Sequence, residues 1–143
     1  MSFDLKLEQG DIRIGSNGDI ATVENGEKLT QDLLKILTTE IGANSFFPAY
    51  GSPITQSMIG RAFDQVFFKS IADSQLRFSV ANLQRLQAEQ MKNNQVVTAQ
   101  EQIAAIQSVD VNQNDIDPRF FNINLVVVSK AFRRVPASFS VSL

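Results

Sequence analysis

The chain has 143 residues, of which 43% are hydrophobic and 20% are charged, with a formal net charge of −2. This length and apolar content predict a single domain over residues 1–143 with a real hydrophobic core. The absence of cysteine and histidine excludes disulfides, thiolate chemistry and the commonest general base and metal ligand.

The N-terminal segment predicts β-structure. Phe3, Leu5 and Leu7 alternate with charged residues, which is typical of a strand with one buried face. Two further β-type segments flank residues 15–18, whose Asn-Gly step is typical of a hairpin turn. The sparse acidic residues here favour turn chemistry over a calcium site. This charged start is unlike a signal peptide, and no apolar run approaches the ~20 residues of a membrane span.

Residues 29–37 carry the spacing of an amphipathic helix, with Leu29, Leu33, Ile36 and Leu37 on one face. Asn25 is the predicted N-cap, and Gly42 is the predicted left-handed residue that stops the helix. We interpret Phe46 and Phe47 in the following loop as side chains that fill the core. A turn through Pro53 then begins the next helix.

A long helical region is predicted from about residue 54 to residue 92, with a bend or pause at residues 70–74. Its distal part is rich in Gln and Asn and has only a thin apolar seam of Leu83, Leu86 and Met91. A seam this narrow indicates a helix that projects or packs on a partner. We therefore predict a helical extension over about residues 63–97.

The last third of the chain predicts a short helix followed by strands. Thr98 and Glu101 have the spacing of a capping box, so a helix through Ile103 and Ile106 is expected before a strand at residues 109–111. Alternating residues then predict strands at 121–128 and 135–143, the second with an apolar face and a serine face. The predicted fold class is α+β, with an N-terminal hairpin, packed helices in the middle and C-terminal antiparallel strands.

Charge is distributed unevenly along the chain. Residues 1–50 contain eight acids and four bases, whereas residues 119–143 contain no acid and four bases, Arg119, Lys130, Arg133 and Arg134. Opposed charges orient a protein in an assembly. Alternatively, the basic residues simply keep a β-rich terminus in solution.

The sequence offers little chemistry for catalysis. It has no glycine-rich phosphate loop and no clustered carboxylates, so we expect no cofactor and no metal site. The best pair of carboxylates for glycoside hydrolysis is Glu40 with Asp11 or Asp19, but a glutamate at a helix end is usually solvated or paired. The basic C-terminal segment lacks a groove-sized helix or an aromatic platform for nucleic acid. We therefore expect a protein that is not an enzyme.

Four segments together resemble the baseplate-wedge, sheath-initiator family of contractile-tailed phages, tailocins and type VI secretion systems. They are GDIRIGSNGDIATV, LTQDLLKILTTEIG, FFPAYGSPI and EQIAAIQSVDV, in the order typical of the family. The resemblance covers most of the chain except about residues 63–97. One departure is that many members carry Glu-Pro-Arg where this chain has Gln100, Glu101 and Gln102.

The resemblance implies a structural virion protein of the tail baseplate, assembled in the bacterial cytoplasm in six copies or a multiple. Its implied partners are the sheath protein, other baseplate wedge proteins and the tube or hub, with no nucleic acid and no membrane. The family presents a small sheet that the first sheath ring completes by strand exchange. An exposed edge strand suits this role because its free N–H and C=O groups pair with an added strand.

The expected contacts follow from the resemblance and the patterning. The wedge contact is expected at Gln100, Glu101, Gln102, Leu83, Leu86 and Met91. The sheath contact is expected in the terminal hairpin, at Asn122, Asn124, Val126, Val128, Lys130, Arg133, Arg134, Ser138, Ser140 and Ser142. Two alternatives remain: a tail-associated, lysozyme-like peptidoglycan hydrolase, and an adaptor in some other secretion machine.

Overall fold

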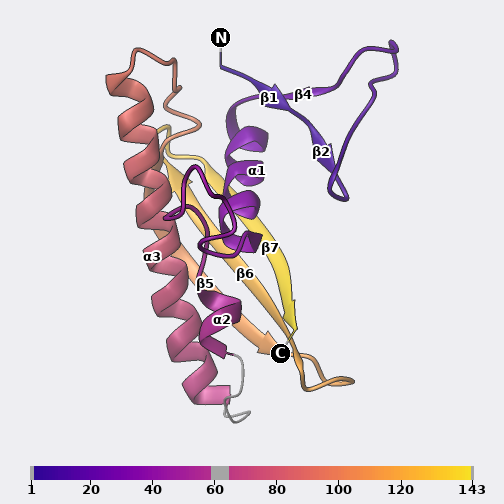
Figure 1. Cartoon of the computed structure of the whole chain (residues 1–143), viewed down its shortest axis with the longest axis vertical. Coiled ribbons are helices and arrows are strands. Elements are labelled where there is room, and N and C mark those ends of the chain that lie inside the picture. Colours follow the sequence, from indigo (N-terminus) through magenta and orange to yellow (C-terminus); the bar gives the residue numbers. More distant parts are fainter. Residues whose placement is uncertain (1, 59–64, 143) are drawn as a thin grey trace.

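The computed structural model describes residues 2–58 and 65–142. Short N-terminal strand pairs, a helical middle and a C-terminal three-stranded antiparallel sheet form an α+β fold, which confirms the predicted class (Figure 1). Among the described residues, no helix combines the length and hydropathy needed to cross a membrane. The elements are β1 (Asp4–Leu5), β2 (Leu7–Glu8), β3 (Asp11–Ile12), β4 (Thr22–Val23), α1 (Asn25–Thr38), α2 (Ile54–Met58), α3 (Gln65–Lys92), β5 (Ile103–Gln113), β6 (Phe120–Ser129) and β7 (Arg134–Ser142).

The C-terminal sheet has the order β5-β6-β7, and both pairs are antiparallel. Alternation along β6 places every second side chain on the inner face, and these four are at most 1% exposed. They are Phe121, Ile123, Leu125 and Val127. The strands predicted at residues 121–128 and 135–143 are thus confirmed over the described residues.

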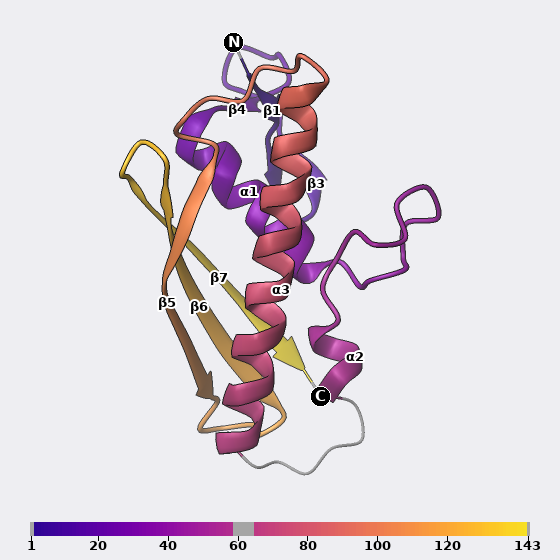
Figure 2. The ribbon, with the colours of Figure 1, turned by 90° about the vertical axis from the view of Figure 1, so that its left-hand side faces the viewer.

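Both long helices cover this inner face (Figure 2). Helix α1 packs on β7, while α3 packs on β5 and on α1. Leu29, Leu33 and Ile36 are fully buried, as the helical spacing predicts. The ring of Phe68 on α3 stacks on that of Phe121, with centroids 3.6 Å apart. The core therefore lies between one helical layer and one sheet.

The region predicted as a short helix through Ile103 and Ile106 is the strand β5, so this prediction is wrong. Residues 98–101 do form a turn in which Glu101 Oε2 accepts from the Thr98 N–H at 3.3 Å, but no helix follows. Two register shifts, between Ile103 and Ala105 and between Ile106 and Ser108, interrupt the alternation of β5. Each bulge adds a residue, which gives a strand the three-residue spacing of a helix.

Helix α3 differs from its predicted form. It runs without interruption through residues 70–74, where we expected a bend, because Ala72 and Leu76 are fully buried in the core. The distal part does not project as a separate extension, since Leu83 is 6% exposed and belongs to the core. Its last residues, 88–92, are all exposed. The part of the predicted helix at residues 59–64 lies outside the described residues.

The predicted ends of α1 also need correction. The N-cap is Glu24, without a side-chain cap bond, while Asn25 is the first helical residue and has a φ of 52°. The helix ends at Thr38, with Thr39 as its C-cap. Gly42 is left-handed, with a φ of 86°, but it forms part of a turn beyond the helix.

The loop after α1 returns to the helix end before α2 begins. The Ser52 N–H donates to the Thr39 carbonyl at 2.8 Å, and the Ile41 N–H donates to the Ser52 carbonyl. Between these contacts Phe46 and Phe47 are 88% and 64% exposed, so the prediction that they fill the core is wrong. The return of the chain fixes the ends of the loop and leaves its aromatic residues at the surface.

Residues 3–23 form an arm of two short strand pairs and one isolated bridge, and part of this arm extends beyond the helices (Figure 1). Lys6, Arg13 and Ala21 bond one another in a ring of three backbone hydrogen bonds of 2.8–3.1 Å. Gln31 on α1 holds the arm by donating to the Leu5 carbonyl and accepting from the Leu7 N–H. Leu5 and Leu7 are 39% and 40% exposed, so the predicted buried face of this segment is wrong.

Candidate interaction surfaces

The outer face of the C-terminal sheet carries two rows of polar side chains across its strands. Asn124 lies between Asp110 on β5 and Ser138 on β7, and Asn122 lies between Asn112 and Ser140. The hydroxyls of Ser138 and Ser140 donate to the Oδ1 atoms of Asn124 and Asn122, both at 2.8 Å. All these side chains are exposed. This part of the outer face is therefore polar, and the strand pairing fixes the spacing between its two rows of side chains.

Most of the residues predicted to contact the sheath share this outer face. The alternation that buries the odd-numbered residues of β6 and β7 turns the even-numbered residues outward. Lys130 and Arg133 lie instead in the hairpin between the two strands. The residues brought together on the outer face are Asn122, Asn124, Val126, Val128, Arg134, Ser138, Ser140 and Ser142.

The outer edge of β7 is open. The Ser129 N–H donates to the Arg133 carbonyl, which fixes the odd-numbered residues of β7 as those bonded to β6. The backbone groups of Ser138, Ser140 and Ser142 therefore point away from the sheet, and no described residue bonds them. Pro136, which lacks an N–H, occupies one of the outward positions, and its carbonyl accepts from the Thr30 hydroxyl at 3.4 Å.

The start of β5, at the opposite edge of the sheet, is covered by α3. The side-chain amide of Gln84 donates to the Ile103 carbonyl at 3.2 Å. The Gln87 amide donates to the Glu101 carbonyl and accepts from the Ile103 N–H. These amide contacts show how this chain shields a strand end, and β7 has no comparable cover along its serine positions.

The residues predicted to contact the wedge do not form one surface. Glu101 is 0% exposed and Gln102 is 9% exposed, so their side chains serve contacts inside this chain. Gln102 donates to the Val97 carbonyl at 3.0 Å. Leu83 belongs to the core. The predicted residues that remain accessible are Gln100, Met91 and, in part, Leu86.

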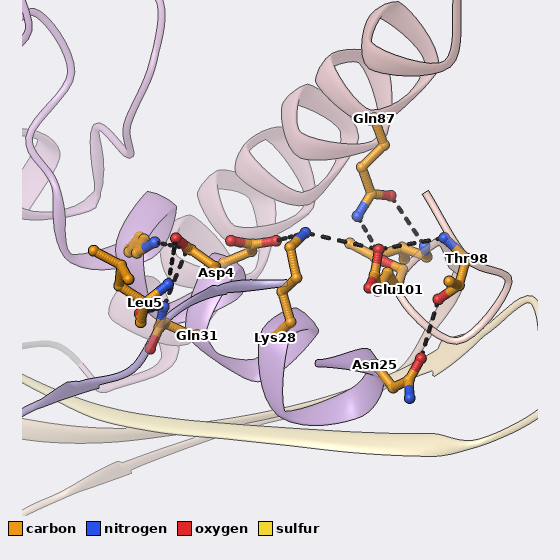
Figure 3. Close-up of polar contacts among 11 residues, drawn as sticks. Asp4, Leu5, Asn25, Lys28, Gln31, Gln87, Thr98 and Glu101 are labelled. Carbon is orange, nitrogen blue, oxygen red and sulfur yellow. Dashed lines mark hydrogen bonds and ion pairs between the residues drawn. The ribbon is translucent and has the colours of Figure 1, made fainter. Parts of the chain in front are cut away.

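The buried Glu101 forms an ionic cluster with Lys28, which Figure 3 shows beside it, and with Asp32, and the last two are partly buried. Lys28 Nζ lies 3.7 Å from Glu101 Oε2 and 3.4 Å from Asp32 Oδ2. The other carboxylate oxygen, Glu101 Oε1, is buried with no hydrogen-bond partner among the described residues. Lys28 is therefore the cation that compensates two carboxylates. This role was not predicted, because Glu101 is far from Lys28 and Asp32 in the sequence.

A cleft of about 590 Å³ opens beside this cluster between the arm, α1 and the end of α3. Burial raises the pKa of Asp32 more than the charge of Lys28 lowers it. Burial, with the nearby charges of Asp32 and Asp4, raises the pKa of Tyr50 to about 12. Burial also acts to raise the pKa of Asp4, but hydrogen bonds from Lys35 and the Leu5 N–H outweigh it and lower that pKa. The cleft is thus charged, with a neutral phenol in its wall.

The carboxylates proposed for glycoside hydrolysis do not form a site of that kind. Glu40 is exposed just beyond α1, and Asp11 and Asp19 are exposed in the arm. A general acid in such enzymes has its pKa raised by an apolar pocket, which none of these three occupies. Among residues 2–58 and 65–142, no group of three or more acidic side chains is arranged to hold a metal ion.

A second surface, missed from sequence, is the apolar side of the arm, which we call the arm face. The side chains flanking the Lys6, Arg13 and Ala21 ring project to the side opposite these three residues. Alternation revealed that one side of the arm is apolar, but the pattern cannot show whether the chain itself covers that side. The arm face consists of Leu5, Leu7, Ile12, Ile14 and Ile20, which are 39–60% exposed.

No protein-family model and no curated protein sequence matches this chain. A crystal structure from Geobacter sulfurreducens, of a protein named a "putative tail lysozyme", is similar to it with a TM-score of 0.63. The two are 11% identical, and the match covers 85% of this chain and 94% of the other. At this sequence identity the similarity shows the fold alone. This chain therefore has the same fold as a protein whose name refers to a tail.

Proposed function

We propose that this chain is a structural component of a contractile-tail baseplate, where it nucleates the sheath by adding a sheath strand to β7. It would sit at the base of the tail tube, with wedge and tube or hub proteins as its other neighbours. The shared fold with a protein named a tail lysozyme supports the association with a tail. The open edge of β7 is the observation that carries the assembly role.

Strand addition suits the chemistry of this edge. The outward N–H and C=O groups of Ser138, Ser140 and Ser142 would pair with an extended segment of the sheath protein. The odd-numbered side chains of β7, among them Val135 and Ala137, stay in the core and hold the edge in register. The polar rows on the outer face would then continue onto the added strand.

The contact with the wedge is proposed for the exposed end of α3 and the turn that follows it. Met91 is 48% exposed, and Gln100 is also exposed. Glu101 and Gln102 would support this surface from inside by fixing the turn. The edge of β7 that would bind the sheath and the surface that would bind the wedge are thus different parts of the molecule. A protein that joins the wedge to the sheath needs two such separate surfaces.

The substitution Ser140→Pro tests the proposal. Proline removes the outward N–H of residue 140, while the bonds from β7 to β6 remain, because those use the odd-numbered residues. Pro136 already occupies an equivalent outward position. We expect sheath polymerisation on reconstituted baseplates to be blocked, scored by electron microscopy, with the wedge still assembled.

The matched control is Ser140→Ala, which keeps the N–H and loses the side-chain bond to Asn122. We expect this variant to polymerise sheath normally. Normal sheath on baseplates that contain Ser140→Pro, confirmed as folded by circular dichroism, would refute β7 as the site of strand addition.

The rival function is a tail-associated peptidoglycan hydrolase, for which the name of the structural neighbour is the only support. We expect a zymogram of the purified protein on cell-wall substrate to show no lysis, because Glu40, Asp11 and Asp19 are exposed and separate. Hen egg-white lysozyme serves as the positive control. Clearing that is lost in Glu40→Gln would overturn the structural assignment.

A further inference from the structure

The hairpin between β6 and β7 ends in an exposed aromatic side chain with cations beside it. Phe132 is 91% exposed, and Lys130, Arg133 and Arg134 are also exposed. None of these three cations lies within ion-pair distance of a carboxylate in the described chain. All three are within two residues of Phe132 in the sequence, so their Cα atoms lie at most about 8 Å from its own. We call these four residues the hairpin tip.

The backbone of Phe132 makes its exposure unusual. Its N–H donates to the Ser129 carbonyl at 2.9 Å and its φ is 59°, so it occupies the left-handed position of a short hairpin loop. Glycine is the ordinary residue there, because a side chain clashes with its own backbone. Phe132 buries almost nothing within the described chain, so no contact there offsets this strain. A strained residue with an exposed aromatic side chain indicates a contact outside the chain.

The hairpin tip is fixed beside the turn that precedes β5. The Lys130 N–H donates to the Gln102 carbonyl at 2.9 Å, and the Ala131 N–H donates to the Ala99 carbonyl at 3.1 Å. These two bonds hold the hairpin against the turn at one end of the sheet (Figure 2). The exposed Gln100 belongs to this turn, so the hairpin tip and Gln100 lie at the same end of the molecule.

The hairpin tip is also separate from the open positions of β7. Ser138 and Ser142 follow Arg134 by four and eight residues along the strand. At the rise of a β-strand these separations are about 13 Å and about 26 Å. A partner at the hairpin tip and a strand added along the serine positions therefore occupy different places, although the sequence assigned both to one sheath contact.

The charge of the hairpin tip selects the class of partner. Three cations without a carboxylate require an anionic partner, and an exposed phenyl ring requires an apolar group beside it. A broad polyanion, such as nucleic acid or an anionic lipid surface, would also face the rest of the chain, whose formal net charge is −2. Lipid recognition by basic clusters takes roughly four to eight such residues. A small acidic patch on a protein meets the hairpin tip alone.

We propose that the hairpin tip binds an acidic segment of another protein, in which carboxylates flank an apolar side chain. Phe132 would pack on that apolar side chain, and the three cations would pair with the carboxylates. The guanidinium groups of Arg133 and Arg134 suit this pairing because they bind carboxylates in a bidentate manner. The partner would lie near Gln100, on the side of the molecule proposed for the wedge. The contact does not require strand addition to β7, so it stands or falls separately from the proposed function.

A library of random short peptides displayed on filamentous phage tests the class of partner. Selection on the purified wild-type protein is expected to enrich sequences with Asp or Glu on both sides of an aromatic or aliphatic residue. Fluorescence anisotropy then measures the Kd of an enriched peptide, which should rise with added salt. Selection that enriches no sequence, or that enriches sequences without acidic residues, would overturn the proposal.

Charge reversal locates the peptide on the protein. Arg133→Glu with Arg134→Glu is expected to raise the Kd of the enriched peptide roughly tenfold or more. Lys69→Glu with Lys92→Glu is the matched control, since it makes the same charge change at exposed positions of α3, and it should bind like the wild type. Equal weakening in the two variants would show an effect of net charge alone and would overturn the proposal.

Ser140→Pro separates this contact from the edge of β7. It removes the outward N–H of residue 140 and leaves the hairpin tip unchanged. We expect the enriched peptide to bind this variant with the wild-type Kd. Lost binding would place the peptide on the edge of β7 and overturn the assignment to the hairpin tip.

Phe132→Gly separates the contact from folding. Glycine relieves the left-handed strain, so the midpoint of thermal unfolding should be unchanged or higher. The Kd of the enriched peptide should rise roughly tenfold, because the central aromatic group is lost. Binding at the wild-type Kd would contradict the role given to Phe132.

Vesicles of phosphatidylcholine and phosphatidylglycerol decide between a protein and a lipid partner. We expect the wild-type protein to stay in the supernatant when these vesicles are sedimented, because the net charge of the chain opposes a broad anionic surface. Cosedimentation of the wild type that is lost in Phe132→Gly would make a lipid surface the occupant of the hairpin tip and overturn the proposal.

Discussion

Replacing Lys28 by methionine is expected to lower the free energy of unfolding by about 3–5 kcal/mol. The substitution keeps the length of the side chain and removes the only cation within ion-pair distance of Glu101 in the described chain. Glu101 is 0% exposed, and its Oε1 already lacks a partner, so its charge would be left without compensation. Urea unfolding followed by circular dichroism measures the loss.

A double variant isolates the cause. Glu101→Gln alone is expected to cost about 1 kcal/mol, because a neutral amide needs less compensation than a carboxylate. Combined with Lys28→Met, it should recover a large part of the stability that the single substitution removes. If the effects of the two substitutions simply add, Lys28 does not stabilise this carboxylate.

The effect of Lys28→Met should depend on pH through Asp32. Burial raises the folded pKa of Asp32 above its ordinary value of 3.8, so the folded state binds the proton more tightly than the unfolded state does. Asp32 therefore contributes fully to the free energy of unfolding below pH 3.8, and this contribution is lost as the pH rises through the folded pKa. Without Lys28 the pKa rises further. Lys28→Met should therefore be less destabilising at pH 4 than at pH 7.

Regular patterns in the sequence predicted the regular elements. Leu29, Leu33 and Ile36 at helical spacing, and the alternation from Phe121 to Val127, correspond to faces that the chain itself buries. In these segments the period of the pattern and the geometry of the element agree. The same patterns correctly assigned the α+β class and the C-terminal strands.

The failures arose where burial or register depends on distant contacts. Two bulges gave β5 the spacing of a helix, and only its pairing with β6 reveals the strand. The thin seam around Leu83 belongs to the core because the sheet lies beneath it. Apolar side chains in the arm were expected to be buried, but a pattern identifies a face without identifying what covers it.

The candidate surfaces were predicted unevenly for the same reason. The even-numbered residues of β6 and β7, from Asn122 to Ser142, share a face because alternation is a local property. The wedge residues at positions 100–102 were placed by resemblance, and the burial of Glu101 depends on Lys28, 73 positions earlier in the chain. The cations in the hairpin between β6 and β7 were identified by charge, but the exposure and left-handed backbone of Phe132 required coordinates.

The largest steric effect is expected at Gly51, where the loop from α1 returns to the helix end. Its φ is 125°, and a Cβ atom added there would lie 2.7 Å from the Thr39 carbonyl oxygen and 2.9 Å from two backbone atoms of Glu40. Backbone atoms cannot move aside as a flexible side chain does. We expect Gly51→Ala to lower the free energy of unfolding by roughly 3 kcal/mol or more, from steric overlap and backbone strain together.

Gly42→Ala provides the control in the same loop. Gly42 is also left-handed, with a φ of 86°, but nothing lies within 4 Å of an added Cβ. We therefore expect Gly42→Ala to lower the free energy of unfolding by roughly 1 kcal/mol, from the left-handed backbone alone. In Gly51→Ala, the bond from the Ser52 N–H to the Thr39 carbonyl should break, and hydrogen exchange at Ser52 should accelerate. Equal losses in the two variants would mean that the close approach at Thr39 is not what fixes the loop. The exposed Phe46 and Phe47 would then be held by the turn at Gly42 instead.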